Sequence, residues 1–138
     1  MSRLCCDARV STDNAVARFR LAVEAGQPDA AADLFAPDAV FHSPIVHKPY
    51  EGREALRAIL RAVGQVFEDF RYTDEFDGVP GTLGHVLVFR ARIGDRELEG
   101  VDILRTDDEG TPTELTVMVR PYSAATLLRE RMSALLSG

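Results

Sequence analysis

Cysteine is nearly absent from the sequence. The two cysteines, Cys5 and Cys6, are adjacent and close to the N-terminus, where they cannot join distant parts of a fold through a disulfide. No further cysteine completes a zinc site, and the three histidines, His42, His47 and His85, lack the spacing of metal-binding pairs. We therefore expect two tail thiols without a structural role and no metal site.

Positive charge and long apolar runs are also scarce. The 16 Lys and Arg residues are outnumbered by 22 Asp and Glu residues, for a formal net charge of -6. Nucleic-acid binding needs a clustered basic face, so we expect no nucleic-acid partner. The longest apolar runs, VLVF and LTVMV, are far shorter than the ~20 residues of a membrane span. Since MSRLCCDARV lacks the apolar core of a secretory signal, we predict a cytoplasmic protein without a membrane partner.

The familiar catalytic motifs are missing as well. The sequence contains no G-x-S-x-G elbow, phosphate-binding Walker loop, dinucleotide fingerprint or paired C-x-x-C. These absences remove the common hydrolase, nucleotide-binding and zinc-binding interpretations, and we predict no cofactor.

Apolar periodicity predicts one folded domain with helices and strands in separate blocks. At 138 residues the chain suffices for a single domain, which we assign to residues 11–138 after an N-terminal tail over 1–10. Apolar residues three and four positions apart predict helices over 12–25, 30–35, 51–67 and 123–136. Between the second and third helices we expect two short extended segments, broken at Ser43 and Pro44.

Alternation of apolar and polar residues predicts four antiparallel strands, over 70–76, 85–93, 96–106 and 113–121. The dipeptide Gly94-Asp95 is typical of the tight turn of a hairpin between the second and third. This order of elements indicates an α+β fold in which helices cover one face of a curved sheet.

Strand alternation also places polar side chains. Asp102 shares a face with Leu98, Gly100 and Leu104, so it lies among apolar neighbours. On the next strand Arg120 shares a face with Thr116 and Met118, and we predict that Asp102 and Arg120 face one cavity. Burial would raise the pKa of Asp102 and a nearby Arg120 would lower it. The alternatives are a structural ion pair and two side chains that never meet.

The stretch FHSPIVHKPYEG carries two of the three histidines. Because histidine titrates near neutral pH, one of them is expected at the pocket mouth as an acid, a base or a hydrogen-bond partner. We assign this position to His42 and expect His47 to be solvated.

Several phrases resemble the nuclear transport factor two-like superfamily, which includes ketosteroid isomerase and polyketide cyclases of the SnoaL type. The matching phrases are VARFRLAVEAGQPDAAADLFAPDAVFHSP, YEGREALRAIL and VDILRTDDEG, and together they span most of the chain. The resemblance implies a cone-shaped sheet curled around a pocket, and frequently a dimer formed through the outer sheet face.

The resemblance carries over only part of the ketosteroid isomerase site. That enzyme uses a first-helix tyrosine, a strand aspartic acid and an aspartate base, and the matching positions here hold Phe19, Asp102 and Ser43. Phenylalanine has no hydroxyl and serine is no base without help, so that mechanism is disfavoured. Limonene epoxide hydrolase, a relative in fold, uses an Asp-Arg-Asp set. Asp102 and Arg120 would supply two of its members, and no motif secures Asp74 or Asp77 as the third.

Three hypotheses follow. The first is a pocket for a small, mainly apolar molecule, with Asp102 and Arg120 as polar anchors and His42 at the mouth. Its predicted wall residues are Phe19, Phe41, Leu60, Val63, Phe67, Thr116 and Met118. The second is a cofactor-free isomerase, cyclase, dehydratase or epoxide hydrolase, with Asp102 as acid or base and Arg120 stabilising an oxyanion.

The third hypothesis is an interaction module that uses the outer sheet face, which we expect to be covered in a homodimer because a large exposed apolar face is unusual in a soluble monomer. The predicted outer-face residues are Leu87, Phe89, Val101, Ile103, Leu115, Val117 and Val119.

Overall fold

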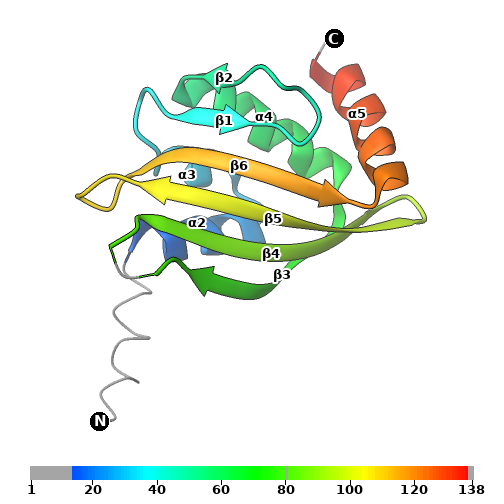
Figure 1. Ribbon diagram of the computed structural model, residues 1–138. Coiled ribbons are helices and arrows are strands. Elements are labelled where there is room, and N and C mark those ends of the chain that lie inside the picture. Colours follow the sequence, from blue (N-terminus) through cyan, green and yellow to red (C-terminus); the bar gives the residue numbers. More distant parts are fainter. Residues whose placement is uncertain (1–13, 80, 137–138) are drawn as a thin grey trace.

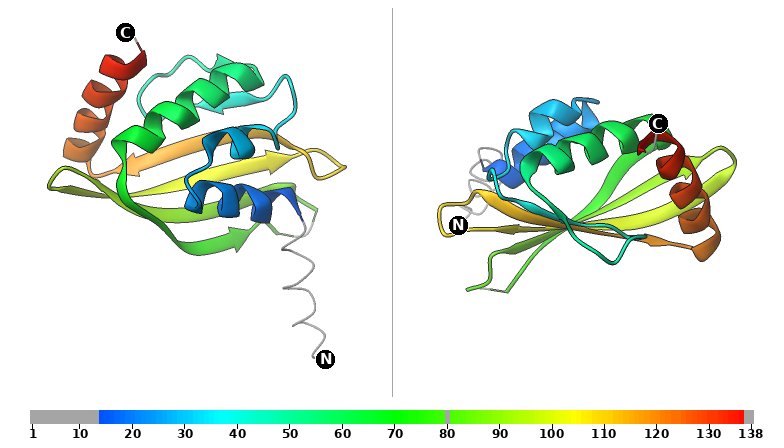
Figure 2. Two further views of the ribbon diagram at one scale, coloured as in Figure 1. Left: turned by 180° about the vertical axis from the view of Figure 1, so that it is seen from behind. Right: turned by 90° about the horizontal axis from the view of Figure 1, so that it is seen from above.

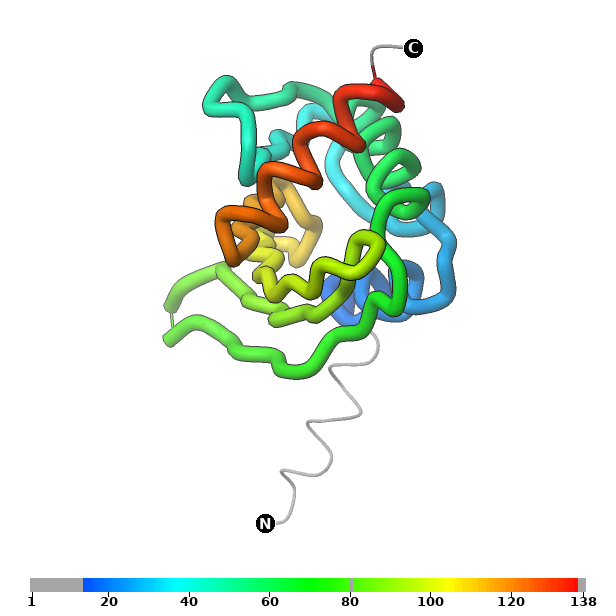
Figure 3. Tube along the Cα trace, turned by 90° about the vertical axis from the view of Figure 1, so that its right-hand side faces the viewer, coloured from blue at the N-terminus to red at the C-terminus, as the bar shows by residue number. Residues whose placement is uncertain are grey.

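The computed structural model describes residues 14–79 and 81–136, so Cys5, Cys6 and the predicted tail lie outside the described residues. One six-stranded curved sheet has the strand order β2-β1-β6-β5-β4-β3. Three helices, α2 (Ala15–Glu24), α3 (Pro28–Ala32) and α4 (Arg53–Val66), pack on its inner face (Figures 1 and 2). The helix α5 (Tyr122–Leu136) lies beside α4 at one end of the sheet (Figure 3). The predicted α+β class is confirmed.

The four long strands form an antiparallel meander. They are β3 (Glu68–Asp77), β4 (Gly84–Ile93), β5 (Arg96–Thr106) and β6 (Pro112–Arg120). The two short predicted segments are β1 (Val40–His42), which pairs parallel with β6, and β2 (Tyr50–Glu51), which pairs antiparallel with β1. Gly94 has φ +62° in the β4–β5 hairpin, a backbone conformation that glycine adopts without strain.

Local side-chain chemistry fixes the helices. Asn14 caps α2, because its Oδ1 accepts a hydrogen bond of 2.8 Å from the Ala17 amide. Polar contacts join α3 to α4: Arg57 Nη2 lies 2.8 Å from Asp33 Oδ1, and Arg61 Nε donates to Asp29 Oδ1 over 2.7 Å. These contacts keep α3 against α4 beside the space between helices and sheet.

Within the described ranges, no helix is long and apolar enough to cross a membrane.

The core lies between the helices and the inner sheet face. It includes Phe19 of α2, Leu56 of α4 and inward-facing residues of the long strands. Leu87, Phe89 and Leu115 are buried in this core, and Val117 and Val119 pack against it. The prediction that these five residues form the outer face was therefore wrong.

Strand register explains the correction. Asp102 is paired with Leu87 on one side and Val117 on the other, and residues directly paired across strands point to the same face. Val101 and Ile103 point the opposite way, toward the outer face, as predicted.

Candidate functional site

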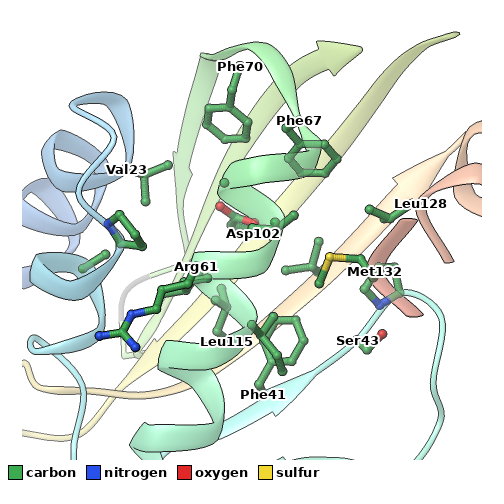
Figure 4. A pocket seen from close by; sticks show the side chains of 18 of the residues that line it. Val23, Phe41, Ser43, Arg61, Phe67, Phe70, Asp102, Leu115, Leu128 and Met132 are labelled. Atoms are coloured by element: carbon green, nitrogen blue, oxygen red, sulfur yellow. The ribbon is translucent and has the colours of Figure 1, made fainter. Parts of the chain in front are cut away.

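A cavity of about 900 Å³ lies between the helices and the inner sheet face (Figure 4). Most of its walls are apolar and come from α2, α4, α5 and the sheet. Five of the seven predicted wall residues line it: Phe19, Phe41, Leu60, Val63 and Phe67. A mainly apolar cavity of this size is typical of a site for a small organic molecule.

Asp102 is the one charged side chain that is buried in the described part of the chain, with 7% of its surface exposed. It projects from β5 into the cavity (Figure 4). Its Oδ2 accepts a hydrogen bond of 2.7 Å from the Tyr72 hydroxyl. No other described group donates to this carboxyl, so its second oxygen has no hydrogen-bond donor among the described residues.

Tyr72 is the residue that sequence reasoning missed. It lies on β3, lines the cavity and is 7% exposed. Its ring packs edge-on against Phe70, with centroids 5.0 Å apart, and the Arg20 guanidinium carbon lies 5.6 Å from the ring centroid. A buried tyrosine hydroxyl needs a hydrogen-bond partner. This requirement was the signal in the sequence that could have identified Tyr72.

The pair has unusual protonation equilibria. Burial raises the pKa of Asp102 to about 7, and the hydrogen bond from Tyr72 opposes that rise. Burial, followed by the negative charge of Asp102, raises the pKa of Tyr72 well above its ordinary value. Tyr72 therefore stays protonated at neutral pH, while Asp102 is present in both forms. The carboxyl can donate a hydrogen bond to a ligand oxygen or accept one, depending on its protonation.

Arg120 does not share this cavity. It lies opposite Glu99 in the register of β5 and β6, and its Nη1 donates to Glu99 Oε1 over 3.4 Å. Thr116 and Met118 share this outer face, and Met118 is 56% exposed. The predicted proximity of Asp102 and Arg120 was wrong, and Thr116 and Met118 are not walls. The alternation of side chains on each strand was predicted correctly. However, the β6 residue that lies on the same sheet face as Asp102 is Val117, and Arg120 lies on the opposite face.

The histidines also lie outside the cavity lining. His42 is hydrogen-bonded through Nε2 to the Glu114 carboxylate, and its neighbour Phe41 is the β1 residue that lines the cavity. The prediction of His42 at the mouth was wrong, because β1 pairs parallel with β6 and turns His42 to the side of Thr116. His47 is exposed, and His85 Nδ1 lies 2.8 Å from Asp77 Oδ1.

Ser43 does line the cavity, but its hydroxyl oxygen accepts hydrogen bonds from the amides of Ile45 (2.9 Å) and Val46 (3.1 Å). It therefore acts as a turn residue. Asp74 and Asp77, the candidates for a second carboxylate, are exposed on β3 and do not line the cavity. Among the described residues, no group of three histidine, cysteine or acidic side chains is placed to hold a metal ion.

Comparison with known proteins agrees with this architecture. The pattern of the SnoaL-like domain family matches residues 16–119. A steroid Δ-isomerase of Nocardioides simplex is 30% identical over 113 residues, which cover 78% of this chain and 88% of that protein. The crystal structure of a steroid Δ-isomerase from Pseudomonas aeruginosa superposes with a TM-score of 0.84 at 40% identity, and the match covers 89% of each chain.

A more distant neighbour shows the same fold. The epoxide hydrolase/cyclase-like enzyme SalBIII, which is involved in pyran ring formation in the polyether salinomycin, has a TM-score of 0.64 at 19% identity. The match covers 80% of this chain and 90% of that one.

Proposed function

The chain belongs to the family of SnoaL-like domains in the nuclear transport factor two-like superfamily, and from this premise we propose that its cavity binds a small apolar molecule through one ligand oxygen. The observation that carries the proposal is the buried Asp102–Tyr72 pair in the wall of an otherwise mainly apolar cavity. In an apolar pocket, the small number of polar groups fixes the orientation of a ligand, and the apolar walls supply most of the binding free energy.

A carbonyl or hydroxyl oxygen suits this pair best. Protonated Asp102 donates to a carbonyl oxygen, and ionised Asp102 accepts from a hydroxyl. Tyr72 already donates its proton to Oδ2, so it holds the carboxyl in place and leaves Oδ1 for the ligand. A ligand without such an oxygen would leave Asp102 with an unmatched polar atom, which costs free energy in an apolar site.

Calorimetric titration with a neutral polycyclic enone, androstenedione, tests the proposal. We expect binding to the wild type and about tenfold weaker binding to Asp102→Ala, because the variant loses one hydrogen bond to a buried polar group. Asp95→Asn is the matched control, since Asp95 is exposed in the β4–β5 turn and does not line the cavity. Equal affinities of the wild type and Asp102→Ala would contradict the proposal.

A second candidate function is double-bond isomerisation of an unsaturated ketone. It is favoured by the near-neutral pKa of Asp102 and by the two similar proteins named steroid Δ-isomerase. In this scheme Asp102 takes the proton from the carbon between the ketone and the double bond. It then returns that proton to the far alkene carbon, so the double bond moves into conjugation with the ketone.

Absorbance of the conjugated product measures this reaction directly. We expect Asp102→Asn to abolish turnover, because an amide cannot take up the proton. Tyr72→Phe should retain turnover with a displaced pH profile, because Asp102 loses the hydrogen bond that lowers its pKa. Undiminished turnover by Asp102→Asn would exclude Asp102 as the base, and a wild type without turnover but with bound enone would leave the binding function alone.

A further inference from the structure

Charged side chains are few around the cavity, and two of the four form ion pairs with other side chains of the protein. The four that line it are Glu24, Arg61, Asp102 and Arg129. Glu24 is paired with Arg20 Nε over 3.2 Å. Arg61 is held by both carboxylate oxygens of Asp29, at 2.7 and 3.0 Å. In Figure 4 the Arg61 side chain points away from Leu128 and Met132 of α5.

Arg129 differs from these residues. It is exposed on α5, where Leu128 and Met132 also line the cavity. In the described part of the chain it forms no ion pair with a carboxylate, although acidic residues outnumber basic ones in the sequence as a whole. Its guanidinium therefore retains a planar set of N–H donors that suits a carboxylate.

We propose that Arg129 binds an anionic group at the outer end of the ligand whose oxygen is held by Asp102. This inference rests on the proposed binding function and specifies its ligand class. The ligand is an elongated apolar acid, with a carbonyl or hydroxyl oxygen at its buried end and a carboxylate at its exposed end.

The arrangement of the cavity supports this ligand class. Its interior offers one buried carboxyl with its tyrosine partner, its walls are mainly apolar, and its rim carries Arg129, which forms no ion pair with any described carboxylate. A carboxylate is poorly accommodated by an apolar wall, so it would stay at the rim where water and Arg129 both reach it. With a net charge of -6, the protein as a whole repels anions, and a local cation is needed to favour one.

The role of Arg129 is tested with two probe ligands, one with a carboxylate charge and one without it. The probes are the androstenone carboxylic acid with a ketone on ring A and a carboxylate on ring D, and the methyl ester of the same acid. Calorimetric titration at low and high salt gives Kd for each probe with the wild type, Arg129→Gln and Arg131→Gln. Arg131 is the matched control, because it is exposed on the same helix but does not line the cavity.

We expect the wild type to bind the acid roughly threefold to fivefold more tightly than the ester, as is typical of one exposed ion pair. This preference should weaken at high salt. It should disappear in Arg129→Gln and persist in Arg131→Gln, while the affinity for the ester stays the same in all three proteins.

The outcomes separate this inference from the function on which it rests. Equal binding of acid and ester by the wild type, or an acid preference that survives in Arg129→Gln, would overturn the role of Arg129 and leave the pocket proposal standing. If the wild type bound neither probe, the proposed function would be overturned, and with it the inference that rests on it.

Discussion

Asp102 is the residue whose environment departs most from that of an ordinary aspartate. It is buried at the inner face of β5, and its described hydrogen-bond partner is the uncharged Tyr72 hydroxyl. Without a cation to compensate, desolvation dominates and raises the pKa of Asp102 to about 7. The carboxyl therefore binds its proton more tightly in the folded protein than in the unfolded chain.

This difference makes stability depend on pH. Between the ordinary aspartate pKa and about 7, the folded state holds a proton on Asp102 that the unfolded state has released, so the free energy of unfolding falls as pH rises through this window. Above pH 7 this group contributes no further slope. We expect the wild type to lose about 2 to 3 kcal/mol between pH 5 and pH 8 relative to Asp102→Asn, in which the group is absent.

Urea unfolding of the two proteins at both pH values measures the difference, and contributions from all other groups cancel in the comparison. Asp95→Asn should follow the wild type, since Asp95 is exposed in the turn. Parallel pH profiles for the wild type and Asp102→Asn would show that Asp102 does not bind its proton more tightly in the folded state.

At the same scale, sequence reasoning identified Asp102 but not its partner. Strand alternation alone places Asp102 among apolar residues, because that property belongs to one strand. The partner Tyr72 lies 30 positions earlier, on a strand that β4 separates from β5. Its proximity depends on strand register, on the curvature of the sheet and on register shifts in the β3–β4 pairing, none of which periodicity reveals.

Among the elements, β5 shows how closely the sheet approaches the core. Gly100 points inward, and a Cβ atom at this position would meet the Phe89 ring and lie 2.7 Å from the Met118 carbonyl oxygen. The strand therefore needs glycine so that the Phe89 ring can pack over it. This is a packing requirement and not a requirement for an unusual φ angle.

We expect Gly100→Ala to lower the free energy of unfolding by roughly 1 to 3 kcal/mol, because Phe89 and the β6 backbone must shift to admit the methyl group. The matched variant is Gly64→Ala on α4, where an added Cβ meets nothing within 4 Å. Alanine there should raise the free energy of unfolding by about 0.5 to 1 kcal/mol through helix propensity. Chemical denaturation compares the two, and a neutral Gly100→Ala would contradict the close packing.

The elements also show why the fold was predicted more completely than the site. Helices and long strands follow from periodicity within single segments, and the observed order agrees with the predicted one. The site depends on which face of one strand meets which face of the next. Both strands were predicted, but Asp102 pairs with Val117 and Glu99 pairs with Arg120, so Arg120 lies on the outer face and not in the cavity. The parallel β1–β6 pairing removed His42 in the same way.

In the whole molecule the two faces of the sheet differ in how they are covered. Described helices pack on the inner face, whereas none covers the outer face, which Figure 1 shows toward the viewer. The outer face carries an apolar group of residues in the middle of the sheet: Val86, Val88, Val101, Ile103 and Met118. Opposite charges, such as Glu99 with Arg90 and Arg120, flank this group toward one end of the strands.

We propose that this outer face is covered by a second copy of the chain, as a homodimer, in preference to an unrelated partner protein. A single face that is apolar at its centre and bears both signs of charge at its margin can be complementary to itself about a two-fold axis. A stable interface buries roughly 800 Å² on each partner, and a sheet face of four long strands offers an area of that order.

Replacing Met118 with a charged residue tests this proposal, since Met118 is 56% exposed and lies at the centre of the outer face beside Val101. In light scattering at micromolar concentration we expect a dimer for the wild type and a monomer for Met118→Lys, because the interface would have to bury the lysine charge without a partner for it. Circular dichroism should be unchanged, since the side chain does not enter the core. Leu21→Lys is the matched control, because Leu21 is 60% exposed on α2, away from the sheet, and this variant should remain dimeric. A monomeric wild type, or equal dissociation of both variants, would exclude the outer face as the site of self-association and leave it open to a different protein partner.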